Sequence, residues 1–371
     1  MVKQVEQWTE IRAADFIEFN PRMSIKKGTI ATKVAMDKLQ PFTKKIPDSE
    51  KASFSGGSKF RNGDTIMARI TPCLENGKTA FVDILGKDEV AFGSTEFIVM
   101  RAREGISDPQ FIYYLATSAW FRNIAIKSMV GSSGRQRVQQ SVLDDLVLNV
   151  PPLEEQKKIS SFLCVLDLKI ALNNEINDNL QQQAQAIYSS MFIDNPDPAW
   201  SHGHLSDLIT VKYGKDHKKL ADGIYPVYGS GGIMRYVERP LYNKESVLIP
   251  RKGTLNNVMY VNQPFWSVDT MFYTEMKLPN VAKFVYHFVK AKDLASMNAG
   301  SAVPSMTTDI LNAMEVVIPS ASALEEFESL VAPMYEAMEA NDVQSKALSQ
   351  IRDTLLPKLM SGEIDVSDVQ L

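Results

Sequence analysis

The segment LVLNVP at residues 146–151 decides how the chain is organised, because it ends a strand-like apolar run and begins a long helical segment. The segment MEVVIP at residues 314–319 makes the same change 168 residues later. Proline suits the first turn of a helix, where its missing N–H leaves no hydrogen bond unmade. The two segments therefore predict an internal repeat in which a strand leads into a long helix twice.

Both helical segments follow the heptad rule of a coiled coil, in which apolar residues recur in alternating steps of four and three. The first seam consists of Ile159, Leu163, Leu166, Ile170, Leu180, Ala184, Ile187 and Met191, and the second of Phe327, Val331, Met334, Met338, Leu348, Leu355 and Leu359. Arg352 interrupts the second series, and we expect its neighbour Ile351 to take its place. Both seams turn polar at matching positions, Asn173 and Asn177 in the first and Asn341 and Ser345 in the second. Such a shared polar layer indicates that the two helices pack on each other.

The sequence before each helix has many short apolar runs separated by Gly, Pro and Asn, which is typical of mixed α/β domains. Strands are expected at 65–70, 79–85, 96–100, 246–249 and 271–273, and short helices near 108–122 and 281–290. The predicted fold class is α+β: two mixed α/β domains separated by a pair of long antiparallel coiled-coil helices, with a pseudo-two-fold internal repeat. The predicted boundaries are 1–152 (first domain), 153–195 (central helix), 196–319 (second domain) and 320–371 (distal helix and tail).

The repeat also reaches into the two domains, although the spacing drifts. FIYYL at 111–115 is echoed by FVYHF at 284–288, and Gly131-Ser132 by Gly300-Ser301. DTIMAR at 64–69 is loosely echoed by SVLIPR at 246–251. A simple duplication without division of labour would also give a repeat, but divergence is concentrated in the basic, Gly-rich blocks, which favours two different binding modules on one support.

Composition excludes several classes of protein. The chain has two cysteines and four histidines without metal-ligand spacing, so neither a disulfide framework nor a metal site is expected. No apolar run is long enough to cross a membrane, and a cytoplasmic location is expected. No P-loop is present, and NVPPL at 149–153 only superficially resembles the Asn-Pro-Pro motif of adenine methyltransferases. We therefore expect no catalytic residues and no bound cofactor.

Charge is distributed unevenly along the chain, although the net charge is only −4. Residues 1–80 carry a net charge of +5 and residues 201–318 of +3, whereas residues 153–200 carry −4 and residues 319–371 carry −7. Because DNA affinity depends on local neutralisation of phosphates, the two basic blocks are compatible with a nucleic-acid partner.

Several segments resemble the specificity subunits of Type I restriction-modification enzymes. PPLEEQKKI at 151–159, LNNEIN at 172–177 and LLPKLMSGEI at 355–364 are similar to that family's conserved regions. YPVYGSGG at 225–232, IPRKG at 249–253, PFW at 264–266 and Asp269-Thr270 resemble a signature of its target-recognition domains. The second helix begins PSAS at 319–322 and lacks the PPLEEQ form. The resemblance covers essentially the whole chain.

This resemblance implies two domains that each recognise half of a split DNA site, and helices that hold them apart and bind two methyltransferase subunits. S-adenosylmethionine would be bound by those subunits, and ATP and Mg²⁺ by restriction and translocase subunits. Two alternatives stay open: a recognition subunit of a Type IIB/IIG-like system, and a coiled-coil protein whose domains bind proteins.

DNA contacts are expected from residues that neutralise phosphates or form hydrogen bonds with base edges. In the first domain the candidates are Lys44, Lys45, Ser55, Gly57, Lys59, Arg61, Arg69, Ser133, Arg135, Gln136 and Arg137. In the second domain they are Lys212, Tyr213, Lys215, Tyr228, Ser230, Gly231, Arg235, Tyr236, Arg251 and Lys252. The loop GSSGRQR at 131–137 is equally compatible with a solvated surface turn, and some of the tyrosines are expected in the core.

The first helix is long enough to act as a spacer. The heptad run 159–191 would extend roughly 50 Å at 1.5 Å per residue. Because a turn of DNA measures about 34–36 Å, we expect a bipartite target with an unread spacer.

Overall fold

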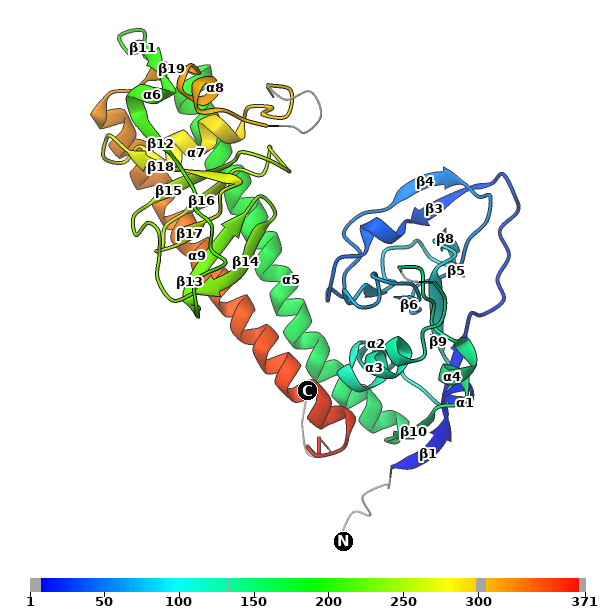
Figure 1. The fold of residues 1–371 in the computed structure, drawn as a ribbon. Helices are drawn as coiled ribbons and strands as arrows, with labels where there is room; N and C mark the ends of the chain where they lie inside the picture. Colours follow the sequence, from blue (N-terminus) through cyan, green and yellow to red (C-terminus); the bar gives the residue numbers. More distant parts are fainter. Residues whose placement is uncertain (1–7, 133, 298–304, 367–371) are drawn as a thin grey trace. The chain divides into compact units, whose positions relative to one another are not determined.

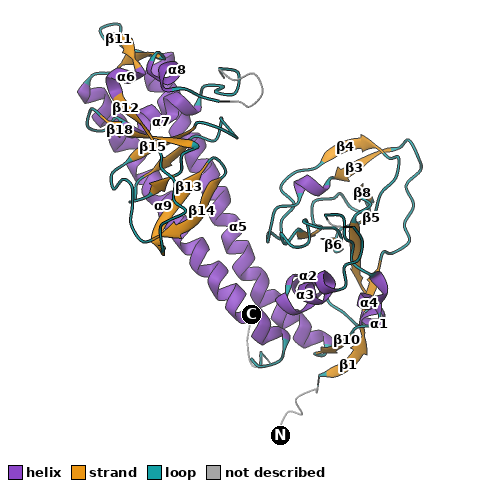
Figure 2. Ribbon diagram, in the orientation of Figure 1, coloured by secondary structure: helices purple, strands orange, loops and turns teal. Residues whose placement is uncertain are grey.

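The computed structural model describes residues 8–132, 134–297 and 305–366, and the chain divides into two compact units. The first unit combines Met1–Asn173 with Asp342–Leu371, and the second is Asn174–Asn341. Each unit contains one mixed α/β domain and a portion of both long helices (Figure 1). Figure 2 shows that helices other than these two are short.

The domain of the first unit is built on two four-stranded sheets and a short strand pair. Its strands are β1 (Thr9–Arg12), β2 (Ile17–Phe19), β3 (Ile30–Val34), β4 (Glu50–Ser53), β5 (Lys59–Phe60), β6 (Thr65–Ala68), β7 (Thr79–Phe81), β8 (Ala91–Gly93), β9 (Phe97–Ala102) and β10 (Val147–Val150). The sheets have the orders β2-β9-β6-β7 and β4-β3-β8-β5, and β1 pairs with β10. The short helices are α1 (Ala13–Phe16), η1 (Met36–Lys38), α2 (Pro109–Thr117), α3 (Ala119–Lys127) and α4 (Gln140–Asp144).

The domain of the second unit repeats this plan with a three-stranded second sheet. Its strands are β11 (Ser201–His204), β12 (Ile209–Tyr213), β13 (Asp222–Gly229), β14 (Gly232–Val237), β15 (Ser246–Pro250), β16 (Met259–Val261), β17 (Trp266–Ser267), β18 (Met271–Met276) and β19 (Glu315–Ile318). They form the sheets β12-β18-β15-β16 and β14-β13-β17 and the pair β11-β19. The short helices are α6 (Leu205–Leu208), α7 (Ala282–Lys290) and α8 (Thr308–Asn312).

The two domains match in every strand except β5, whose place in the second domain is taken by an isolated bridge between Tyr242 and Phe265. In each, the strand before the long helix pairs antiparallel with the first strand of the domain, β10 with β1 and β19 with β11. In each, one parallel pair occurs at the same place of the second sheet, β3 with β8 and β13 with β17. The predicted fold class and internal repeat are therefore confirmed, and the repeat extends through the whole of each domain.

The long helices are α5 (Leu153–Ser189) and α9 (Ala321–Met360), and they pack antiparallel within each unit. In the first unit the amide of Asn173 donates to Gln344 Oε1 at 2.9 Å and to Ser345 Oγ at 3.2 Å. In the second, the amide of Asn341 donates to Asn177 Oδ1 at 2.8 Å. The polar positions of the two seams thus contact each other. A π-helical turn, η2 (Ser190–Asp194), follows α5 and ends before Pro196.

Our expectation for the interrupted seam is wrong. Ile351 is 46% exposed, whereas Arg352 points into the first unit and pairs with Asp167 of α5 at 2.7 Å. Only 19% of the Arg352 side chain and 11% of the Asp167 side chain are exposed. The hydroxyl of Tyr114 also donates to Asp167, at 2.6 Å. The heptad position is therefore filled by a charged residue because the facing helix supplies its counter-ion.

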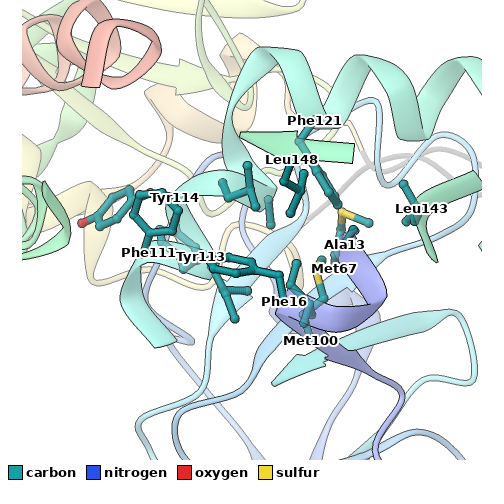
Figure 3. Close-up of a cluster of buried hydrophobic side chains, with 14 of the residues drawn as sticks. Ala13, Phe16, Met67, Met100, Phe111, Tyr113, Tyr114, Phe121, Leu143 and Leu148 are labelled. Carbon is teal, nitrogen blue, oxygen red and sulfur yellow. The ribbon is translucent and has the colours of Figure 1, made fainter. Parts of the chain in front are cut away.

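One apolar cluster, whose residues in the first domain Figure 3 labels, also includes residues of the long helices. Phe16 and Phe111 meet edge to face, with their ring centroids 6.1 Å apart, and both are buried together with Ile159 and Leu359 of the long helices. Helix α2 is placed by Asp108, whose side chain accepts from the N–H of Phe111 as an N-terminal cap. The core is thus continuous from the sheet into the helix pair.

Candidate nucleic-acid interface

The first domain contains an open groove whose walls are polar and basic. Its volume is about 530 Å³, and it is lined by Asn20, Pro21, Arg22, Met23, Gly57, Ser58, Lys59, Arg69, Thr95, Phe97 and Val99. Of the candidates predicted from sequence, the groove brings together Gly57, Lys59 and Arg69. Cations at an open hollow are what a polyanionic ligand requires.

The groove depends on two close approaches of the backbone. A Cβ atom at Gly57 would lie 2.0 Å from the carbonyl oxygen of Gly93, so only glycine fits there. Asn20 has a positive φ of 49°, and its side chain accepts from the N–H of Val99 at 3.0 Å. Asparagine tolerates this left-handed conformation better than most residues. The first contact places Gly57 against β8, and the second holds the segment after β2 against β9.

Arg69 extends from the end of β6 into this groove. Its N–H donates to the carbonyl of Glu96 at 2.8 Å, and its carbonyl accepts from the N–H of Val138 at 2.9 Å. The guanidinium donates from Nη2 to the carbonyl of Val138 at 3.2 Å, and its Nε is buried without a partner among the described residues.

The loop 131–137 lies beside Arg69, and its far end is fixed by hydrogen bonds. Arg137 forms antiparallel bridges with Val130 and Ile70. Its guanidinium donates three hydrogen bonds of 2.7–3.0 Å to the carboxylate of Glu96. These bonds hold the pKa of Glu96 below its usual value, and the charge of Arg69 adds to the effect. Arg135 is exposed, Gln136 is half-buried, and Ser133 lies outside the described residues.

The remaining candidates of the first domain do not line the groove. The ammonium of Lys44 is enclosed by aromatic rings, 4.8 Å from the centroid of Tyr114, and it donates to the Tyr114 hydroxyl at 3.2 Å. Lys45 and Ser55 are exposed. Arg61 is exposed in the turn between β5 and β6, where its N–H donates to Asp64 at 2.8 Å.

In the second domain, Tyr213 and Arg251 come together. The guanidinium of Arg251 lies 5.4 Å from the ring centroid of Tyr213, an arrangement typical of a cation–π contact. Its Nη1 also donates to the carbonyl of Asp269 at 3.3 Å. Lys212 forms an ion pair with Glu275 at 3.6 Å, and Lys215 is exposed.

The other candidates of this domain surround the β13–β14 hairpin. Tyr228 is buried, and its hydroxyl accepts from Gln263 at 3.2 Å. Arg235 donates to Asp222 at 2.7 Å and to the carbonyl of Leu220 at 3.0 Å. Ser230 is half-buried, and its carbonyl accepts from the side-chain amide of Asn257. The remaining candidates, Gly231, Tyr236 and Lys252, are exposed.

The structure also shows residues that sequence inspection missed. Asn20 and Arg22 line the first groove together with Thr95, which lies far from them in the chain. No sequence motif marks them, because the groove forms only when the ends of β2, β6 and β9 meet. Position in the chain could have indicated Arg22, because it closely follows the first strand of the main sheet, as the predicted Lys215 does in the second domain.

The predicted helix-pairing residues are all buried or half-buried. Ile159, Leu163, Asn173, Phe327 and Val331 are buried, and Leu166, Ile170, Asn177, Leu180, Ile187, Met334, Met338, Asn341, Leu348 and Leu355 are half-buried.

Two kinds of feature are missing from the parts of the chain that the structure describes. No cluster of His, Cys, Asp or Glu side chains has the arrangement to hold a metal ion. None of the helices there is both long enough and apolar enough to cross a bilayer.

Comparison with known proteins gives a consistent family. The family model for the Type I restriction modification DNA specificity domain matches twice, at residues 6–182 and 199–327. The specificity subunit of the Type I restriction enzyme HindI from Haemophilus influenzae is 23% identical over 420 residues, covering 82% of this chain and 87% of that protein. The MjaIX specificity subunit from Methanocaldococcus jannaschii is 24% identical over 304 residues, covering 70% of each.

A solved structure has the same fold. The S subunit of a Type I restriction-modification system from M. genitalium aligns with a TM-score of 0.59 at 17% identity, covering 97% of both chains.

Proposed function

The chain belongs to the family of Type I restriction-modification DNA specificity proteins, and we propose that each of its two domains binds one half of a bipartite DNA target. The observation that carries this proposal is the repeated main sheet with a basic residue at the same place in both domains, Arg69 after β6 and Arg251 after β15. Two similar frames with different surface residues are suited to two different half-sequences.

Mapping adenine methylation across the genome of cells with and without this chain tests the proposal. We expect one split motif to lose methylation when the chain is absent. Exchanging the second domain for that of another family member should change one half of the motif and leave the other half intact. If methylation does not depend on the chain, or if both halves change together, the proposal is wrong.

We further propose that the paired helices set the distance between the two half-sites. With 37 residues, α5 would extend about 55 Å at 1.5 Å per residue. Removing one heptad from each helix keeps the seam in phase and shortens each by about 10 Å. We expect such a variant to recognise the same two half-sequences with a different spacer, and an unchanged spacer would refute this role.

The chain is proposed to act without catalytic residues of its own, together with two methyltransferase subunits and with restriction subunits. S-adenosylmethionine, ATP and Mg²⁺ would then be bound by those partners. The purified chain assayed alone should neither methylate nor cleave DNA that carries its target. Turnover by the chain alone would contradict this assignment.

An exposed apolar stripe on α5 supports docking of a partner protein in the first unit. Val165, Leu168 and Leu172 recur at helical spacing and are 58%, 69% and 46% exposed. Large apolar side chains grouped on a helix face are typical of protein interfaces. We propose that a methyltransferase subunit covers this stripe.

A further inference from the structure

Arg69 and Arg251 hold the same backbone position in the two domains. The N–H of Arg69 donates to the carbonyl of Glu96, and its own carbonyl accepts from Val138. The N–H of Arg251 donates to the carbonyl of Thr270, and its own carbonyl accepts from Met306, both at 2.9 Å. The two guanidinium groups therefore start from equivalent points of the fold.

The residues around these arginines differ between the domains. Glu96 of the first domain corresponds to Thr270 of the second, because each accepts from the equivalent arginine N–H. Phe97 and Met271, the next residues, begin the matching strands β9 and β18. Arginine is the same in both domains although its neighbours differ. This suggests that it contacts a part of the DNA that is common to both half-sites. In DNA that common part is the phosphodiester backbone, whereas the bases differ.

The guanidinium of Arg69 has fewer acceptors among the described residues than it has donors. It has five N–H donors, yet one hydrogen bond is formed, to the carbonyl of Val138, and its Nε is buried without a partner among the described residues. By contrast, Arg137 donates three hydrogen bonds to Glu96, and Arg101 two to Asp64. Because an unsatisfied buried donor is costly, an anionic ligand in this groove would remove the deficit.

Arg251 is similarly available. Its guanidinium donates to the carbonyl of Asp269 and lies over the face of Tyr213. In each domain a cation also lies in the segment after the first strand of the main sheet. Arg22 lines the same groove as Arg69, and the exposed Lys215 lies in the corresponding segment after β12.

We propose that Arg69 and Arg251 are matched phosphate anchors that fix each domain on the DNA backbone without reading bases. This inference rests on the proposed function, and it divides the interface into a repeated anchor and the variable surface around it. Sequence selectivity then belongs to neighbouring residues such as Arg135 in the first domain.

The first test measures DNA affinity against salt concentration. Fluorescence anisotropy with a random-sequence duplex is recorded for the full chain, for Arg69→Gln, for Arg251→Gln and for the double variant. Lys127→Gln and Lys290→Gln are controls, because each removes an exposed charge at the end of a short helix. Losing one phosphate contact should make the slope of log K against log salt shallower by about 1. Each arginine variant should bind roughly tenfold more weakly at low salt, with the losses multiplying in the double variant.

The second test maps methylation in cells whose chain is replaced by each variant. We expect the wild-type motif at reduced occupancy. A base changed or relaxed in either half-site would show that the arginine reads that base, and would overturn the anchor. Wild-type slope and affinity in both variants would also overturn it. If the wild-type chain itself shows no salt-dependent DNA binding, the proposed function fails, which is a separate outcome.

Discussion

Replacing Arg352 with leucine should destabilise the first unit by about 3 kcal/mol, because the carboxylate of Asp167 would stay buried without its counter-ion. Removing one partner of a buried ion pair costs about 3–5 kcal/mol. We expect the lower end of this range, since the hydroxyl of Tyr114 still donates to Asp167. In a unit of about 200 residues each kcal/mol lowers Tm by about 2–4 °C, so the transition should shift by roughly 6–12 °C.

Scanning calorimetry on the full chain measures this shift and resolves transitions that belong to separate units. The double variant Arg352→Leu with Asp167→Asn removes both charges and keeps an acceptor for Tyr114, so it should recover most of the loss. Asp353→Asn is the control. Asp353 also contacts Arg352, at 2.8 Å, but it is 65% exposed, and its loss should cost less than about 1 kcal/mol. If Arg352→Leu costs no more than Asp353→Asn, or if the double variant is additive, the ion pair does not hold the seam.

Three further changes test other parts of the structure. Burial lowers the pKa of His287 to about 4 from an ordinary 6.5, so the folded chain keeps the imidazole neutral while the unfolded chain takes up a proton. The free energy of unfolding should therefore fall by up to about 3 kcal/mol as the pH drops from 6.5 to 4. Chemical denaturation across this pH range measures the loss. The loss should be smaller in His287→Gln and the same as in the wild type in the exposed His202→Gln. Gly214→Ala places a Cβ 2.0 Å from a main-chain oxygen, so it should lower Tm and weaken DNA binding. The control Gly231→Ala adds a Cβ in open space and should keep the wild-type Tm. Equal Tm values for the two variants would count against this packing. Leu168→Glu should keep the wild-type Tm and DNA affinity but reduce co-purification of the methyltransferase subunit, and full recovery of that subunit would exclude the stripe as its docking site.

The architecture could be predicted because its signals are local and repeated. Prolines after a strand-like run, followed by heptads, mark both long helices, and the matching Asn173 and Asn341 indicated that they pair. The first strands of the domains were not recognised as equivalent, because SHGH at 201–204 has no apolar pattern and the two domains differ in length. Arg352 was misjudged for a different reason: its place in the seam depends on a carboxylate of the other helix.

The candidate interface could be predicted only in part. Basic residues in Gly-rich segments were visible in the sequence, and several of them, such as Arg69, line the groove. The partners of each cation were not visible, since they come from other segments. Lys44 looks like a phosphate contact in the sequence, yet aromatic rings enclose its ammonium. Arg22 looks ordinary in the sequence, yet folding places it beside Arg69.

The first unit is built from two separate stretches of the chain, and this has a consequence for biosynthesis. The second unit is one uninterrupted stretch, so a nascent chain holds all of it once residue 341 has left the ribosome. The first unit, although translated earlier, still lacks the part of α9 that supplies Arg352 and Leu359. Until this part of α9 is synthesised, Asp167 lacks its counter-ion, and the apolar residues of α5 that pack against it stay exposed to solvent. The later-made unit can thus mature first, and the earlier one is the better substrate for a chaperone during translation.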